Sequence, residues 1–93
     1  MRLRSPSMSE LHAFAAAARL GSFTRAAQEL CVTQGAISRA IARLEAHFGQ
    51  PLVQRNAHRL VLTAAGRTLI DAVAEPLAAI ESAAPDVGQF AVG

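Results

Sequence analysis

A group of polar and basic residues near the middle of the chain has the chemistry needed to read nucleic acid. Gln34 carries an amide suited to bidentate pairing with adenine, and Arg39 and Arg43 carry guanidinium groups suited to guanine or phosphate. Ser38 can meet a base edge or a phosphate oxygen. Thr33 precedes them and can cap a helix, whose free N–H groups and positive dipole end would face a phosphate. The sequence therefore predicts a helix that contacts nucleic acid through its first turns.

The charge distribution predicts an anionic partner for the first two thirds of the chain. Residues 1–67 contain all nine arginines and three acids, a balance of +6. Residues 68–93 contain four acids and no base, a balance of −4. The chain has no lysine, and arginine recognises phosphate and guanine in a bidentate manner that lysine cannot match. A basic front and an acidic back favour binding of an anion by the front.

The sequence lacks the signatures of several other classes of protein. The 93 residues make one domain, and 52% apolar residues with 17% charged residues are too apolar for a disordered chain. The longest apolar run is six residues, whereas a membrane span needs about twenty. The sequence has no glycine-rich phosphate loop, nucleophile motif or zinc-ligand spacing, so we expect no enzyme, metal site or cofactor. The single cysteine, Cys31, excludes an internal disulfide and is predicted to be packed.

The apolar spacing predicts the helices that would position the polar group. One helix is expected over residues 9–20 with Ser9 as its cap, a short one over 24–31, and a third over 34–48. The third helix carries an apolar stripe with spacings of four, three and four residues, which defines a narrow face toward the core. The predicted core includes Phe14, Phe23, Ile37, Ile41, Leu44 and Phe48.

The period of the pattern then changes to that of a small β-hairpin. Residues 52–55 and 60–63 are strand-like and flank a polar turn, so Arg55, His58 and Arg59 fall at or near the hairpin tip. The order of helix, short helix, tight turn, helix and hairpin is that of a winged helix-turn-helix, in which the helix after the turn enters the major groove. We therefore predict a mostly α fold with a small β-hairpin wing, whose tip approaches a minor groove or the DNA backbone.

A fourth helix is predicted to follow the wing. Residues 1–63 are expected to form the DNA-binding domain, residues 64–84 a long linker helix, and residues 85–93 a linker or the start of a further domain. Pro76 is expected to kink the helix. The helix carries a heptad-like stripe that could pair with a second copy or pack on its own domain: Leu69, Val73, Leu77, Ile80 and Ala84.

Several blocks in fixed order resemble the N-terminal domain of LysR-type transcriptional regulators. These blocks are Gly21–Ala27, Val32–Arg39, Ile41–Glu45, Phe48–Arg55 and Leu62–Gly66. The Ser-Phe-Thr-Arg-Ala-Ala and Ala-Ile-Ser sequences look nearest to the branch that includes glycine-cleavage and β-lactamase activators.

The resemblance implies a sequence-specific regulator of transcription that binds double-stranded DNA. Such proteins bind interrupted inverted repeats as dimers joined through the linker helix, and full-length members commonly form tetramers. Their longer C-terminal half binds a small-molecule inducer, so we expect a DNA-binding fragment, with an inducer only where that second domain exists. A cytoplasmic, nucleoid-associated location follows from this role. Matching positions and residue chemistry together give the expected DNA-binding set: Thr24, Arg25, Thr33, Gln34, Gly35, Ala36, Ser38, Arg39, Arg43, Arg55 and Arg59.

Simpler interpretations remain beside this one. Arg39 and Arg43 could be solvated helix residues, Gln34 could contact phosphate or cap locally, and Arg55 could pair with Glu45. The whole domain could instead mediate protein–protein contact without DNA, or serve only as a dimerisation module. Both of these alternatives predict little salt-dependent binding to duplex DNA.

Overall fold

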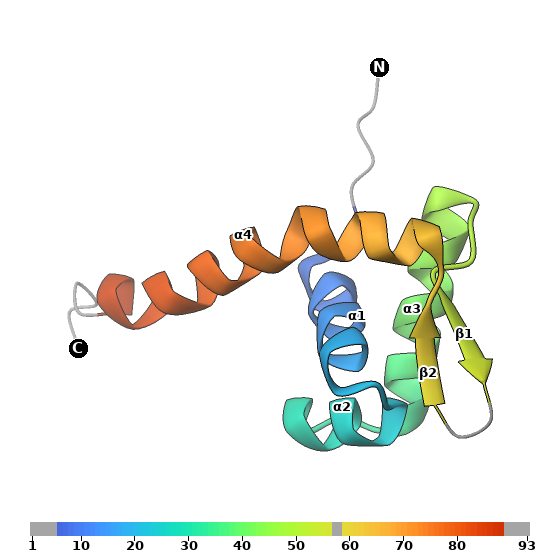
Figure 1. The fold of residues 1–93 in the computed structure, drawn as a ribbon. Helices are drawn as coiled ribbons and strands as arrows, with labels where there is room; N and C mark the ends of the chain where they lie inside the picture. The colour runs from blue at the N-terminus through green and yellow to red at the C-terminus, as the bar shows by residue number, and fades with distance from the viewer. Residues whose placement is uncertain (1–5, 57–58, 89–93) are drawn as a thin grey trace.

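The chain folds as three helices, a β-hairpin and a long fourth helix in this computed structural model, which describes residues 6–56 and 59–88 (Figure 1). The elements are α1 (Met8–Leu20), α2 (Phe23–Leu30), α3 (Gln34–Phe48), β1 (Val53–Asn56), β2 (Arg59–Leu62) and α4 (Ala64–Gly88). The antiparallel strands pair from Val53–Leu62 to Asn56–Arg59. This arrangement is the predicted winged helix-turn-helix with a linker helix. Helix α2 lies at one end of the domain, and α4 crosses the opposite end and extends beyond it.

Hydroxyl side chains fix where the helices begin. Ser22 and Thr33 cap α2 and α3 by accepting hydrogen bonds from N–H groups three residues later, at 3.1 and 3.0 Å. The prediction that Ser9 caps α1 was wrong, because Ser7 forms a capping box with Glu10. In this box the Ser7 hydroxyl accepts from the Glu10 N–H, and the Glu10 carboxylate accepts from the Ser7 N–H.

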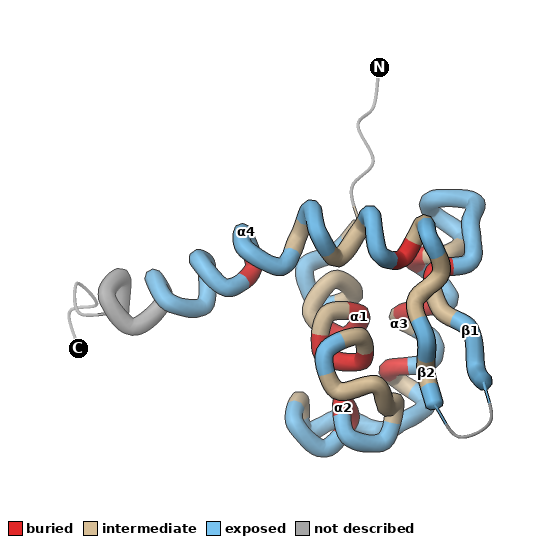
Figure 2. The backbone as a smooth tube through the Cα atoms, in the orientation of Figure 1, coloured by how far each residue is buried: buried red, intermediate tan, exposed pale blue. Residues whose placement is uncertain are grey.

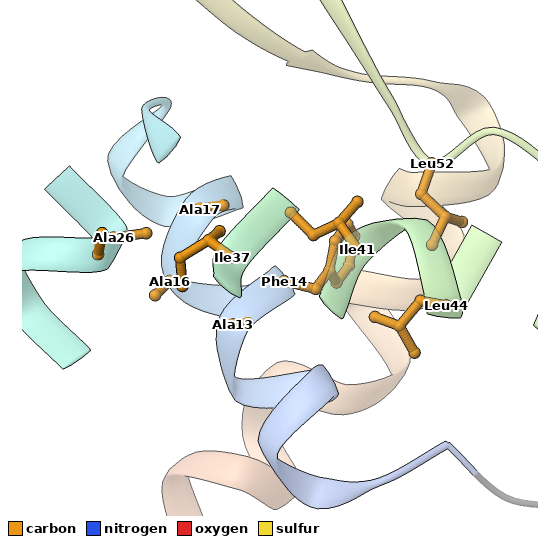
Figure 3. Close-up of a cluster of buried hydrophobic side chains, with 10 residues drawn as sticks. Ala13, Phe14, Ala16, Ala17, Ala26, Ile37, Ile41, Leu44 and Leu52 are labelled. Carbon is orange, nitrogen blue, oxygen red and sulfur yellow. The ribbon is translucent and has the colours of Figure 1, made fainter. Parts of the chain in front are cut away.

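The core lies between α1, α2 and α3 and is closed by the residue that precedes the wing (Figure 3). Its largest fully buried side chains are Phe14, Ile37, Ile41, Leu44 and Leu52. Alanines on α1 and α2 fill the remaining positions, and their small size allows the helices to approach closely.

Two residues expected to be packed are exposed instead. Phe48 is 43% exposed, since the last position of the α3 stripe lies beyond the end of the core, and its ring meets His47 edge-on with centroids 4.7 Å apart. Cys31 is also exposed and ends α2 in the left-handed conformation, with φ of 58°. Helix ends commonly adopt this conformation, usually at glycine.

The base of the wing is held by a carboxylate on α3. Glu45 accepts hydrogen bonds from the backbone N–H groups of Leu52 and Val53, at 2.8 and 3.4 Å. These bonds tie the start of the wing to the third helix. The alternative that Arg55 pairs with Glu45 is not found among the described residues, where the carboxylate accepts from backbone N–H groups instead.

Helix α4 begins in close contact with the wing base. The Thr63 hydroxyl accepts from the Gly66 N–H at 3.0 Å and donates to the Pro51 carbonyl at 2.6 Å. Gly66 is buried, and a Cβ there would lie 2.0 Å from the Leu52 carbonyl oxygen. Only glycine allows this approach of helix to wing.

The far end of α4 differs from the expected boundaries. The helix continues through Pro76 and reaches Gly88, four residues beyond the predicted end at 84. Residues 85–88, expected to be linker, are helical, and the rest of the predicted linker lies outside the described residues. His12 of α1 lies against this helix, with Nδ1 3.2 Å from an oxygen of Glu81.

Candidate nucleic-acid interface

The cap and the first two turns of α3 present their polar residues to solvent. Thr33, Gln34, Gly35, Ser38 and Arg39 are exposed, while the apolar stripe of the same helix faces the core. Ala36 is half-buried behind them. Capping by Thr33 leaves other N–H groups of the first turn without helical partners, so the positive end of the helix dipole is available to an anion.

Three separate elements bring their polar residues to one hollow. Its lining includes Thr24 from the start of α2, Gln34 from the start of α3, and Arg55 and Arg59 from the two strands of the wing. These four residues were all predicted to contact DNA. The fold therefore joins two helix N-termini and two arginines on one concave, electropositive surface. We call it the α2–α3–wing hollow.

The arginines predicted to contact DNA form no ion pair with an acid of the described residues. Arg25, Arg39, Arg43, Arg55 and Arg59 are exposed. Among the residues that the structure describes, the only arginine ion pair joins Arg19 of α1 to Glu29 of α2. The arginines in the predicted DNA-binding set thus have their guanidinium groups available to phosphates or base edges.

Not every predicted contact residue lies in the hollow. Arg39 folds back over its own helix, since a Cβ placed on Gly35 would lie 3.2 Å from Arg39 Nη1. Arg43 lines a different depression, with Ser9 and Glu10 of α1, so it lies away from the wing. Arg25 and Ser38 are exposed but outside the hollow. His58, expected near the hairpin tip, lies outside the described residues.

Buried and half-buried positions recur along α4 as far as Leu77, and the described positions beyond it are exposed (Figure 2). Leu69 and Val73 are half-buried and Leu77 is only 5% exposed, because this side of the helix lies over its own domain. Leu77 lines a shallow groove with Ala15 of α1. Ile80, by contrast, is 49% exposed. Ala84, the last predicted member, has no described side chain.

One residue of the hollow was assigned by sequence to the core alone. Phe23, the first residue of α2, is half-buried against the core cluster. The Arg55 guanidinium also lies over its ring, with Cζ 4.6 Å from the ring centroid. Phe23 and Arg55 are 32 positions apart, so no local pattern could reveal this contact.

The described part of the chain lacks the features of a metal site and of a membrane span. No three His, Cys, Asp or Glu side chains there gather as a metal ion would require. None of the described helices has the length and apolar character to cross a bilayer.

Comparison with known proteins identifies the family. The pattern of the bacterial regulatory helix-turn-helix proteins of the lysR family matches residues 8–67, well over half of the chain. The chain belongs to the LysR family. This LysR-type chain therefore comes from a family of transcription regulators, not of enzymes.

Individual relatives agree with this assignment. The chain is 46% identical over 69 residues to the uncharacterised HTH-type transcriptional regulator y4mQ of Sinorhizobium fredii, covering 74% of this chain and 23% of that protein. It is 47% identical over 68 residues to the glycine cleavage system transcriptional activator of Escherichia coli, covering 73% of this chain and 22% of that protein. The LysR-type chain thus spans less than a quarter of the length of either relative.

A solved structure shares both the fold and the linker helix. The DNA-binding domain of BenM, solved in complex with catB site 1 DNA, superposes with a TM-score of 0.79 at 28% identity. The match covers 94% of this LysR-type chain and 97% of that one. The predicted winged helix-turn-helix is therefore confirmed as the fold of this family.

Proposed function

We propose that this LysR-type domain binds a specific double-stranded DNA sequence and thereby regulates transcription. Helix α3 enters the major groove, where Gln34, Ser38 and Arg39 read bases and Thr33, Gly35 and Ala36 allow the helix end to approach closely. Thr24 and Arg25 contact the backbone, and Arg43 supplements the basic charge of α3. The wing brings Arg55 and Arg59 to a neighbouring minor groove or phosphate.

The observation that carries this proposal is the α2–α3–wing hollow. Separate surface residues would be scattered if they served only solubility. Instead, Thr24, Gln34, Arg55 and Arg59 come from three elements and line one surface. The DNA complex of BenM supports the same use of this fold. No cofactor is needed for this activity.

Selection from a pool of randomised duplexes tests the proposal. The chain is incubated with the pool at near-physiological salt, and the bound fraction is sequenced after several rounds. We expect an enriched interrupted inverted repeat, with affinity that falls by about 0.9 log unit per log unit of salt for each phosphate contacted. A pool that stays random, with weak binding at low salt only, would instead favour the protein–protein interaction module.

Replacing Gln34 with alanine is expected to relax the selected sequence at one position of each half-site. An amide paired with a base contributes about 1–3 kcal/mol of discrimination, and its loss leaves the phosphate contacts in place. Repeating the selection with Gln34→Ala measures this effect directly. Gln50→Ala is the matched control, because Gln50 is an exposed amide beyond the opposite end of α3. An unchanged preference in the Gln34 variant would assign that residue to phosphate contact or local capping.

We also propose that two copies pair through α4. The exposed stretch beyond Leu77 offers Ile80 to a partner, whereas Leu69, Val73 and Leu77 support the helix from their own domain. Ala84 lies one turn further along the same stripe and extends the proposed contact. Tetramers, an inducer and a cytoplasmic, nucleoid-associated location belong to this proposal for a longer protein that includes the domain.

An Ile80→Asp substitution is expected to convert the dimer to a monomer, because it places a charge in an apolar interface. Sedimentation velocity measures the change in mass. Ala79→Asp, one position away on the exposed helix surface, is the control for added charge. A variant that keeps the parent mass would reject α4 pairing at Ile80. Leu77→Asp is a poorer probe, since burial of Leu77 in one copy makes that change destabilise the docking of α4.

A further inference from the structure

Two contacts between described residues join the wing to the start of α2. The Leu60 N–H of β2 donates to the Gly21 carbonyl in the turn before α2, at 3.4 Å. The Arg55 guanidinium of β1 lies over the ring of Phe23, with Cζ 4.6 Å from the centroid. Arg55 and Leu60 are paired across the hairpin, so the two contacts attach the same pair of strand positions to the start of α2.

The position of Phe23 is fixed independently of the wing. It is the first residue of α2, directly after the Ser22 cap, and its side chain packs against the core cluster. Arg55, in contrast, is an exposed residue on a two-stranded hairpin. An exposed arginine loses rotamer entropy when it is fixed. The ring therefore offers a rigid surface to a side chain that would otherwise move freely.

Stacking leaves Arg55 able to bind DNA. The five N–H donors of a guanidinium lie in its plane and point outward from its edge, while the ring attracts its face. The same side chain lines the hollow with Gln34 and Arg59. A phosphate or base edge can thus be bound without breaking the contact to the ring.

We infer that Phe23 is a positioning residue for DNA binding, which holds the Arg55 guanidinium at the edge of the α2–α3–wing hollow. This inference rests on the proposed function for its effect on DNA. The stacking lowers the entropy lost on binding and fixes the wing relative to α3. Phe23 therefore acts through Arg55 and does not itself contact DNA.

A double-mutant cycle on the selected operator tests this coupling. Phe23→Leu retains an apolar side chain but removes the ring, and is expected to weaken binding roughly two- to five-fold per half-site, the range of a cation–π contact. In an Arg55→Ala background the same change is expected to cause no further loss. Phe23→Tyr retains the ring and is expected to bind like the parent. The inference would be overturned if the losses of affinity from Phe23→Leu and Arg55→Ala added in the double variant. It would also be overturned if Phe23→Tyr bound the operator as weakly as Phe23→Leu.

Two further measurements separate a positioning role from a structural one. Thermal unfolding of Phe23→Leu in an Arg55→Ala background reports the loss of core packing alone, and the fall in Tm should be slightly larger when Arg55 is present, because the contact to the ring is then lost as well. In NMR spectra of the free domain, the Arg55 side-chain protons should show an upfield ring-current shift that disappears in Phe23→Leu. Absence of that shift would refute the stacking even if the parent selects an operator. If the ring-current shift is present but the selection yields no operator, the proposed function is refuted while the contact between Phe23 and Arg55 stands.

Discussion

Gly66→Ala is expected to destabilise the folded domain by about 3 kcal/mol or more. The added Cβ would lie 2.0 Å from the Leu52 carbonyl oxygen and 3.0 Å from its carbon. Neither group can easily move, since Leu52 is 1% exposed and its carbonyl accepts the Thr63 N–H at 3.0 Å. Alanine gains only about 1 kcal/mol over glycine in helix propensity, so the overlap dominates.

Thermal unfolding measures this effect. For a domain of this size, 1 kcal/mol corresponds to about 4–8 °C in Tm, so a fall of at least 10 °C is expected. Gly21→Ala is the matched control, because Gly21 has a φ of 64° but open space around its Cβ position. It should cost about 1 kcal/mol through backbone strain alone. Equal stability of the parent and Gly66→Ala would show that the helix and wing are not in such close contact.

Arg39→Ala is expected to weaken operator binding roughly thirty-fold or more. Removing an arginine contact costs about 1–3 kcal/mol, and a dimer on an inverted repeat loses that contact twice. Arg39 is exposed on α3, and its guanidinium lies over Gly35 in the first turn, next to the free N–H groups of the helix end. Fluorescence anisotropy over a range of salt concentrations measures both the affinity and its salt dependence.

The matched control for this prediction is Arg67→Ala, which removes the same charge from an exposed position near the start of α4. It should leave affinity nearly unchanged. If Arg39 contacts phosphate, the slope of log affinity against log salt should become shallower by about 0.9 for each site lost. If it contacts a base, the selected sequence should change instead. Equal losses from both arginines would indicate general attraction of charge and contradict a specific role.

The sequence predicted the helix-turn-helix well because its boundaries depend on neighbouring residues. Thr33 as the cap of α3 and Gly49 as its end follow from local hydrogen bonding and left-handed backbone conformation. The choice of Ser9 over Ser7 failed because two adjacent hydroxyls compete. The reciprocal bond from Glu10 decides between them.

Contacts between distant segments could not be predicted in this way. The spacing of the α3 stripe correctly places Phe48 in the same row as Ile37. It does not show that the core ends before that row does. Glu45 could be expected to pair with an arginine, yet it accepts backbone N–H groups at the wing base. Likewise, the heptad spacing on α4 predicts an apolar face without saying that Leu77 is covered by its own domain. Each outcome depends on how separate elements meet.

The connection between wing and linker helix has a mechanical consequence. Thr63 alone separates β2 from α4, and both its backbone and its hydroxyl are bonded to neighbouring segments, so the helix leaves the domain without a hinge. The 25 residues of α4 extend roughly 37 Å from this junction, and Leu69, Val73 and Leu77 hold the first half of the helix against the domain. At the base of the helix, Glu45 ties the start of the wing to the C-terminal part of α3. A force on the far end of α4 is therefore transmitted to the helix that carries Gln34 and Arg39.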